Sequence, residues 1–171
     1  MSDKFYGKYR GTVVNNVDLT QQGRILATVT DVGGIPPGTW CMPCLPVLGL
    51  NSGVFAVPPV GAGVWIEFEQ GEVDHPIWTG CYAGSAADIP LMAKTAPAPI
   101  SAITLQTMAK HGIVISDAGG PMALGGITLQ TATGVTLSVT DAGIFINNGK
   151  GAQISLVGPT VDINTGALTI T

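Results

Sequence analysis

The sequence predicts an all-β protein made of two dissimilar parts, and three observations carry this prediction. Gly accounts for 24 of the 171 residues, and charged residues make up 11%, against about 25% in ordinary soluble domains. Short stretches alternate between aliphatic and polar side chains, which is the period of a β-strand. The composition also changes along the chain: all the Trp and Tyr residues lie within 1–82, whereas 103–171 has 11 threonines and five charged side chains.

The first part, residues 1–82, has the pattern of a small barrel of short strands. We expect strands at 5–15, 24–32, 39–45, 53–57, 63–69 and 77–82. Turn-forming residues at 33–38 and 71–76 separate some of them, and the last two strands form a hairpin. About five short strands in roughly 80 residues fit a barrel of the OB-fold type, whose closure removes exposed strand edges.

The rest of the chain consists of a linker and a repetitive region. Residues 83–102 are rich in Ala and Pro without periodicity, which is typical of a semi-extended linker. In residues 103–171, short alternating strands start at 103, 112, 127, 135, 144, 154, 161 and 168. The segment ITLQT at 103 recurs at 127, and DAG at 117 recurs at 141, both at an offset of 24 residues. Such a repeat indicates a stacked architecture.

Each strand of the repetitive region has one apolar face that a single chain cannot cover. Roughly 14 aliphatic side chains would stay partly wet, at about 1.5–3 kcal/mol each relative to burial. Three chains around one axis would bury them, since a cyclic assembly uses the same surface of every copy. We therefore expect an intertwined trimeric β-helix, with a monomeric parallel β-helix as the alternative. The expected trimer interior is Ile113, Ile115, Ile127, Leu129, Val135, Leu137, Ile144, Ile146, Ile154, Leu156, Val161 and Ile163.

The run from Val57 to Gly80 carries a family resemblance. It reads VPPVGAGVWIEFEQGEVDHPIWTG, with a Pro-x-x-Gly stretch before an alternating strand, an acidic turn, and a Pro-aliphatic-x-x-Gly segment. This pattern resembles the OB-fold core of central spikes of contractile tails, including phage baseplate assembly protein V, VgrG spikes and spikes of extracellular injection systems. The Thr-, Ile- and Gly-rich tail, ending GPTVDINTGALTIT, is similar to the triple-stranded β-helix that follows the OB domain there.

The resemblance implies a mechanical, non-enzymatic function for a homotrimer. Its OB domains would dock on a separate hub protein at the end of the inner tube, because the chain starts at the OB domain and lacks the hub domain of VgrG. Sheath contraction would drive the spike into the target envelope, in transient contact with its membrane. We expect assembly in the cytoplasm, with no signal peptide and no transmembrane segment.

The resemblance also implies a partner at the C-terminal end. Some phage spikes end in a metal-binding His-x-His tip, and this chain has no such pair. A separate PAAR-type tip protein is therefore expected on the last residues of the chain. These are Ala167, Leu168, Thr169, Ile170 and Thr171.

Two other functions stay open from the residues alone. An OB-fold nucleic-acid binder needs a basic groove with exposed aromatic side chains. Residues 1–82 hold four basic and seven acidic side chains, and the chain has a net charge of −4, so no nucleic-acid partner is expected. A β-helical polysaccharide-degrading enzyme needs a cleft lined with charged residues. The repetitive region offers only Asp117, Asp141 and Asp162, at or near turns, and we expect no catalytic residue.

The cysteines raise the question of a metal or redox site. Cys41 and Cys44 have the C-x-x-C spacing of such sites, and Cys81 and His75 could complete a zinc set. The motif lies in strand and turn sequence, away from any helix N-terminus. We therefore interpret the cysteines as free thiols and small hydrophobic residues, and expect neither a metal nor a cofactor.

The remaining titratable side chains are given structural roles. His75 and His111 lie in turns. Glu67 and Glu69 are expected on the same side of one strand, since side chains repeat every two residues. A carboxylate pair can serve glycoside hydrolysis, but we interpret this one as part of the solvated barrel face.

Overall fold

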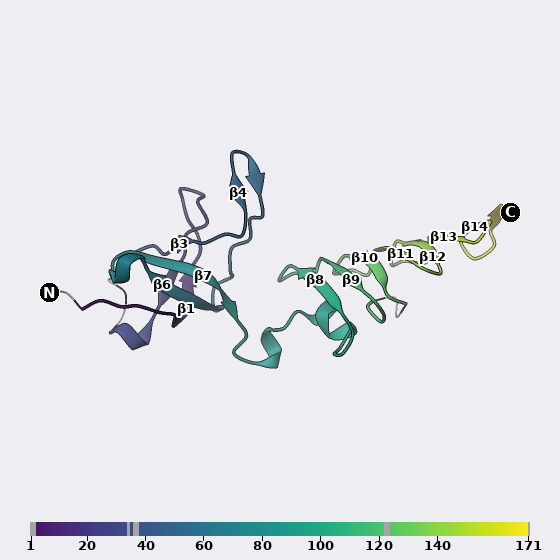
Figure 1. The fold of residues 1–171 in the computed structure, drawn as a ribbon. Coiled ribbons are helices and arrows are strands. Elements are labelled where there is room, and N and C mark those ends of the chain that lie inside the picture. The colour runs from purple at the N-terminus through teal and green to yellow at the C-terminus, as the bar shows by residue number, and fades with distance from the viewer. Residues whose placement is uncertain (1–2, 34, 36–37, 122–123, 171) are drawn as a thin grey trace. The chain divides into compact units, whose positions relative to one another are not determined.

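The computed structural model describes residues 3–33, 35, 38–121 and 124–170 (Figure 1). These residues form β-strands and short 3-10 helices and contain no α-helix, so the all-β prediction is confirmed. Among them, no helix has the length and apolar character needed to cross a membrane. The chain divides into two compact units, Met1–Gly84 and Ser85–Thr171.

Five strands form the main sheet of the first unit. They are β1 (Tyr9–Asn15), β2 (Leu26–Thr28), β3 (Met42–Pro43), β6 (Gly63–Phe68) and β7 (Pro76–Tyr82). Their order is β2-β1-β6-β7-β3, with antiparallel pairs except for the parallel β3–β7 pair. Ile25 and Cys41, next to the two edge strands, exchange backbone hydrogen bonds of 3.2 and 2.8 Å. This bridge links the two edges, which gives the curled OB-type sheet that the sequence predicts.

The first unit has a hydrophobic core of its own. Alternate residues of β6 point into it, since a strand presents every second side chain to the same face. The eight buried residues are Val13, Ile25, Val29, Cys41, Val64, Ile66, Phe68 and Trp78. Trp78 donates its indole N–H to the carbonyl oxygen of Gly23 at 3.0 Å, so the polar atom of this buried side chain is satisfied.

Four predicted strands of the first unit are wrong in extent. The strands expected at 5–15 and 39–45 are shortened to β1 and β3. The strand expected at 24–32 is reduced to β2, because Thr30–Val32 forms a 3-10 helix (η1). In place of the strand expected at 53–57, the chain forms a hairpin of β4 (Leu48–Gly49) and β5 (Ser52–Gly53). A Cβ on Gly53, at φ +145, would lie 2.4 Å from the Val47 carbonyl oxygen, so this hairpin requires Gly there. Of the turn predicted at 33–38, residues 34, 36 and 37 lie outside the described residues.

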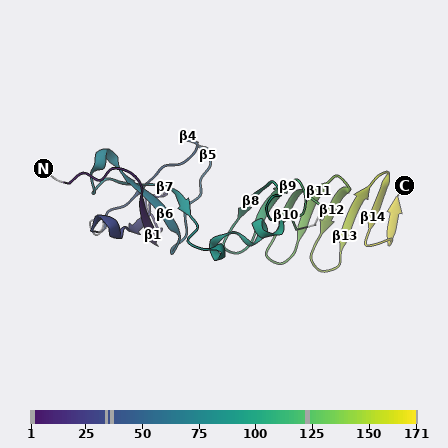
Figure 2. The same ribbon diagram turned by 60° about the horizontal axis from the view of Figure 1, so that its bottom comes forward.

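Eight strands form one antiparallel sheet in the second unit, and each pairs with its neighbours in sequence (Figure 2). They are β8 (Ala102–Gln106), β9 (Gly112–Ser116), β10 (Gly126–Gln130), β11 (Thr136–Thr140), β12 (Gly143–Asn147), β13 (Gln153–Val157), β14 (Thr160–Ile163) and β15 (Leu168–Ile170). Every predicted start lies within one residue of the observed one. These pairs form within one chain, and the winding of three chains into a β-helix stays a prediction.

Part of the predicted linker is folded onto the second unit. After η3 (Ala86–Asp88), a second 3-10 helix, η4 (Leu91–Thr95), contacts β8 and β9. Met92 in η4 is buried, and its backbone N–H donates to the side-chain oxygen of Gln106 at 2.8 Å. The segment is therefore anchored to the sheet where an extended linker was expected.

Candidate functional site

One face of the second unit's sheet carries two unbroken rows of aliphatic side chains, named here the aliphatic face. The strand register places Ile115 opposite Ile127, and Ile113 opposite Leu129, and the same arrangement continues from β8 to β15. The first row is Ile103, Ile115, Ile127, Val139, Ile144, Leu156, Val161 and Ile170. The second row is Leu105, Ile113, Leu129, Leu137, Ile146, Ile154, Ile163 and Leu168.

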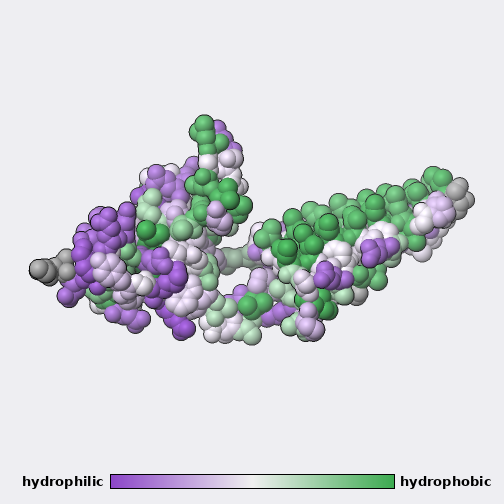
Figure 3. All heavy atoms as spheres, viewed as in Figure 1, coloured by the Kyte–Doolittle hydropathy of each residue, from purple (hydrophilic) through white to green (hydrophobic). Residues whose placement is uncertain are grey.

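A single copy of the chain leaves the aliphatic face uncovered. Fourteen of its sixteen side chains are between 36% (Ile113) and 65% (Leu105) exposed. In the core of the first unit, by comparison, Ile25 and Ile66 are fully buried. Figure 3 shows hydrophobic atoms gathered along this sheet. A continuous apolar surface of this extent marks an interaction site.

The opposite face of the same sheet carries mostly small polar side chains. Its central row includes Thr104, Val114, Thr128, Ser138, Phe145, Ser155 and Asp162. Thr128 and Ser138 are buried, and their hydroxyl oxygens share a hydrogen bond of 3.0 Å. The second unit thus buries hydroxyl groups and exposes Ile and Leu, which is the reverse of an ordinary protein interior. This inverted polarity indicates that the aliphatic face is completed by other chains.

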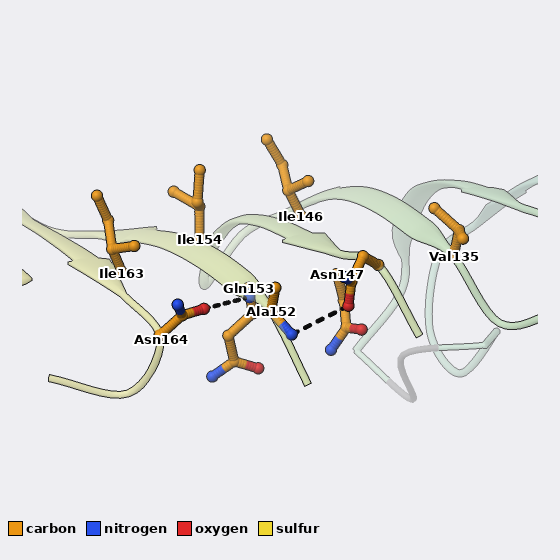
Figure 4. A pocket seen from close by; sticks show the side chains of 9 residues that line it. Val135, Ile146, Asn147, Ala152, Gln153, Ile154, Ile163 and Asn164 are labelled. Carbon is orange, nitrogen blue, oxygen red and sulfur yellow. Dashed lines mark hydrogen bonds between the residues drawn. The ribbon is translucent and has the colours of Figure 1, made fainter. Parts of the chain in front are cut away.

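A hollow of about 320 Å³ lies on the aliphatic side of strands β12 to β14, beside Val135. Figure 4 shows Val135, Ile146, Ile154 and Ile163 pointing to the same side, with amide side chains near the strand ends. Its lining contains neither a carboxylate nor a histidine, cysteine or cationic group. The hollow therefore presents apolar surface to a partner and no acid, base or nucleophile to a substrate.

The amide side chains beside this hollow hold the turns of the sheet. Asn148 Oδ1 accepts hydrogen bonds from the N–H groups of Lys150 and Ala152 at 2.9 and 3.0 Å. Asn164 Oδ1 accepts one from the Gln153 N–H at 2.9 Å. These bonds satisfy loop N–H groups that the strand ladder leaves unpaired. The turns between short strands are therefore fixed by local side chains.

The aspartates considered for polysaccharide chemistry lie on separate parts of the sheet. Asp117 follows β9, Asp141 lies in the turn between β11 and β12, and Asp162 lies in β14. The Asp162 carboxylate accepts a hydrogen bond from the Gly166 N–H at 3.0 Å, which is a turn-capping role. At least one strand separates any two of these aspartates in the sheet order.

The two glutamates of the first unit do not form the expected pair on one strand. β6 ends at Phe68, and Glu69 opens a 3-10 helix, η2 (Glu69–Gly71), so the strand period no longer applies to it. Glu67 instead forms an exposed ion pair with Lys8 at 2.5 Å.

The histidines occupy turn positions. The His75 N–H donates to the Glu72 carbonyl oxygen at 3.0 Å, within the turn before β7. His111 precedes β9 and accepts a hydrogen bond from the Ala132 N–H on its Nδ1 at 3.4 Å. Among the described residues, no hydrogen bond joins either imidazole to a carboxylate that would orient it as a general base.

The three cysteines are free thiols. Cys41 lies in the core of the first unit, where burial raises the pKa of its thiol to about 11, while Cys44 and Cys81 are exposed. The Cys81 thiol pKa is also raised, by partial burial. A thiol with a raised pKa is a weak nucleophile and a weak metal ligand at neutral pH. Within the described ranges, no three His, Cys, Asp or Glu side chains converge on a point that could hold a metal ion.

The structure places eleven of the twelve residues predicted for the trimer interior in the two rows. Val135 lies just before β11 and outside the two rows. In this strand the rows are formed by Leu137 and Val139. The predicted interior does not include five members of the rows: Val139 in β11, Ile103 and Leu105 in β8, and Leu168 and Ile170 in β15, which were assigned to the tip contact. The repeated ITLQT segment was the available signal, because it gives the residues at 103 and 105 the same positions as those at 127 and 129.

The residues predicted for the tip contact lie at the last strand. Leu168 and Ile170, in β15, are the final members of the two rows and are 52% and 57% exposed. Ala167 is in the turn that precedes β15, Thr169 pairs with Asp162, and Thr171 lies outside the described residues.

Comparison with known families matches both units. Residues 9–82 match the model described as the type VI secretion system/phage-baseplate injector OB domain. Residues 102–169 match the model described as the phage baseplate V C-terminal trimerisation domain. A search of curated proteins found no match.

Proposed function

The chain belongs to the phage baseplate V family of spike proteins, and from this premise we propose that it is the central spike of a contractile injection machine. Its OB and trimerisation domains support a phage-tail-like spike role and a homotrimer. Our proposal adds the mechanism: three chains close their aliphatic faces around one axis, dock by their OB units on a hub, and puncture the target envelope when the sheath contracts.

The observation that carries the proposal is the uncovered aliphatic face. On average, a little under half of the surface of each side chain in this face is exposed to solvent in a single chain and can be buried on association. At about 1.5–3 kcal/mol for full burial of one side chain, the sixteen together would contribute about 10–20 kcal/mol per chain. This gain opposes the loss of translational and rotational freedom on association, which costs about 4–15 kcal/mol. Burial in a trimer can therefore stabilise a unit that has almost no core of its own.

The proposed assembly also suits a mechanical load. Each strand between β8 and β15 is hydrogen-bonded to a neighbour on both sides, and the turns are held by side-chain bonds such as Asn148 to Ala152. A dry trimer interior would leave no interior water to weaken these bonds. We propose that such a body transmits force along the stack of strands, acts without a chemical step, and is assembled in the cytoplasm before it joins the particle.

The mass of the purified full chain in solution is the primary test. Sedimentation equilibrium or light scattering should give three times 17.4 kDa. A mass of one chain at micromolar concentration would refute the proposed trimer and, with it, the spike.

The proposed partners need separate measurements. A PAAR-type protein should bind the wild-type chain and lose binding to the double variant Leu168→Asp/Ile170→Asp. A hub protein should bind both forms equally at concentrations where both keep the three-chain mass, because that contact is proposed for the OB units while Leu168 and Ile170 also belong to the aliphatic face. If the tip protein binds the double variant as well as the wild type, the tip contact is not at β15.

A further inference from the structure

The first unit carries an exposed apolar hairpin that its own core does not use. The apolar hairpin is defined by Val47, Leu48, Leu50, Val54 and Phe55, which are between 56% and 95% exposed. Figure 3 shows hydrophobic atoms over the β4–β5 hairpin. No charged residue occurs from Val32 to Ile66, so the hairpin also lacks the charges that usually protect an exposed strand edge.

The apolar hairpin has a defined backbone. Its two strands pair in register, and the Val54 N–H donates to the Val47 carbonyl oxygen at 2.9 Å. The close approach at Gly53 admits no side chain, and Asn51 takes the left-handed φ of +54 at the turn. Phe55 lies against Gly23, where a Cβ would come within 3.0 Å of its ring. Leu50 is therefore held 95% exposed at the end of an ordered element.

A second apolar set lies elsewhere on the same unit, at the end of β1. This valine patch is defined by Val14, Val17 and Val60, which are 49%, 67% and 58% exposed. Its backbone is joined by the hydrogen bond from the Gly61 N–H to the Val13 carbonyl oxygen, at 2.8 Å. The one carboxylate nearby in sequence, Asp18, is 4% exposed and paired with Arg24 at 2.7 Å. The patch thus presents apolar side chains without a free charge close to it in sequence.

We propose that the apolar hairpin of each copy packs on the valine patch of the next copy, forming a ring of three contacts among the OB units. This inference rests on the proposed trimer, which tethers three first units at an effective concentration in the millimolar range. A contact between two different patches closes into a ring when the symmetry of the assembly returns it to the starting copy. Three-fold symmetry set by the second units would supply that closure and would give every apolar hairpin an apolar partner.

Site-specific photocrosslinking in the purified full chain tests this contact. A benzophenone amino acid at Leu50 should crosslink to a peptide of a second copy that contains Val14, Val17 or Val60, and the same probe at Val17 should crosslink to the apolar hairpin. Tyr6 is the matched control, because it is 70% exposed on the same unit and outside both patches. Its intercopy crosslinking should be several-fold lower, since Tyr6 is not part of the proposed contact.

A variant and a mass measurement make the result decisive. Leu48→Ser/Leu50→Ser should keep the three-chain mass and lose most of the crosslink from a probe at Val17. A three-chain mass with no intercopy crosslink from Leu50, or with equal crosslinking from Tyr6, would overturn the ring and leave the spike standing. That outcome would assign the apolar hairpin to a different protein or to a membrane. A one-chain mass would overturn both proposals.

Discussion

Replacing Val139 with Asp tests the aliphatic face at a single position. Val139 lies in the first row, opposite Ile127 and Ile144, and is 46% exposed. Val157 provides a matched control, because it is also a valine near a strand end and is 47% exposed. It lies one residue after Leu156 and therefore points to the opposite face. The two substitutions are alike in chemistry and exposure and differ in the face that they alter.

The expected loss follows from the exposed fraction of Val139. Burying the remaining 46% of a side chain worth about 1.5–3 kcal/mol in full contributes about 0.7–1.4 kcal/mol, or about 2–4 kcal/mol for three copies. At 1.4 kcal/mol for each factor of ten, the three-chain dissociation constant should rise about 30- to 700-fold. Desolvation of three carboxylates would add to this cost.

Sedimentation equilibrium over a range of concentrations measures this change directly. Val157→Asp should keep the three-chain mass at concentrations where Val139→Asp has dissociated. Near-ultraviolet circular dichroism of the tryptophans, which all lie in the first unit, controls for unfolding of that unit in both variants. If the two variants dissociate at the same concentration, the reasoning about which face is buried is wrong.

Three further predictions concern stability. Asp18 accepts hydrogen bonds from Arg24 and from loop N–H groups, which lower the pKa of its carboxyl below the ordinary value of 3.8. The ionised Asp18 carboxylate therefore stabilises the folded first unit above about pH 3.8, and this stabilisation is lost as the pH falls below that value. In urea unfolding, Asp18→Asn should be less stable than wild type at pH 7, and the difference in unfolding free energy should shrink below about pH 3.8. Trp78→Phe leaves the Gly23 carbonyl unpaired and should cost the first unit about 1–3 kcal/mol in the same assay. Dilution should lower the melting temperature of the second unit more than that of the first, which has a core of its own, as differential scanning calorimetry can show.

The strands of the second unit could be predicted closely, because each is a short alternating run bounded by Gly or Asn. Side chains repeat every two residues on a strand, so the pattern also identifies which residues share a face. The pattern does not fix where a strand begins relative to its partner. Val135, Leu137 and Val139 have the same parity, and only the pairing of Leu137 with Leu129 shows that the rows continue in Leu137 and Val139, rather than in Val135 and Leu137.

The first unit was less predictable, because its barrel depends on contacts between distant and very short segments. β3 is two residues long, and the bridge that joins the sheet edges connects Ile25 to Cys41. Neither feature has a periodicity that a sequence window can detect. The β4–β5 hairpin follows from the backbone freedom of Gly53, which a pattern of hydrophobic residues does not reveal.

The two edges of the second unit's sheet differ in a way that bears on the proposed tip contact. At β8, the chain itself provides cover: η4 lies beside the strand, and buried Met92 reaches the side chain of Gln106. At β15, the described residues provide no further strand or helix, and the edge presents Leu168 and Ile170, both more than half exposed. An uncovered edge with free backbone groups and apolar side chains favours association with another protein. If the tip protein binds here, it should protect the backbone amides of β15 from hydrogen exchange and leave those of β8 unchanged, and protection at β8 alone would contradict the proposed orientation.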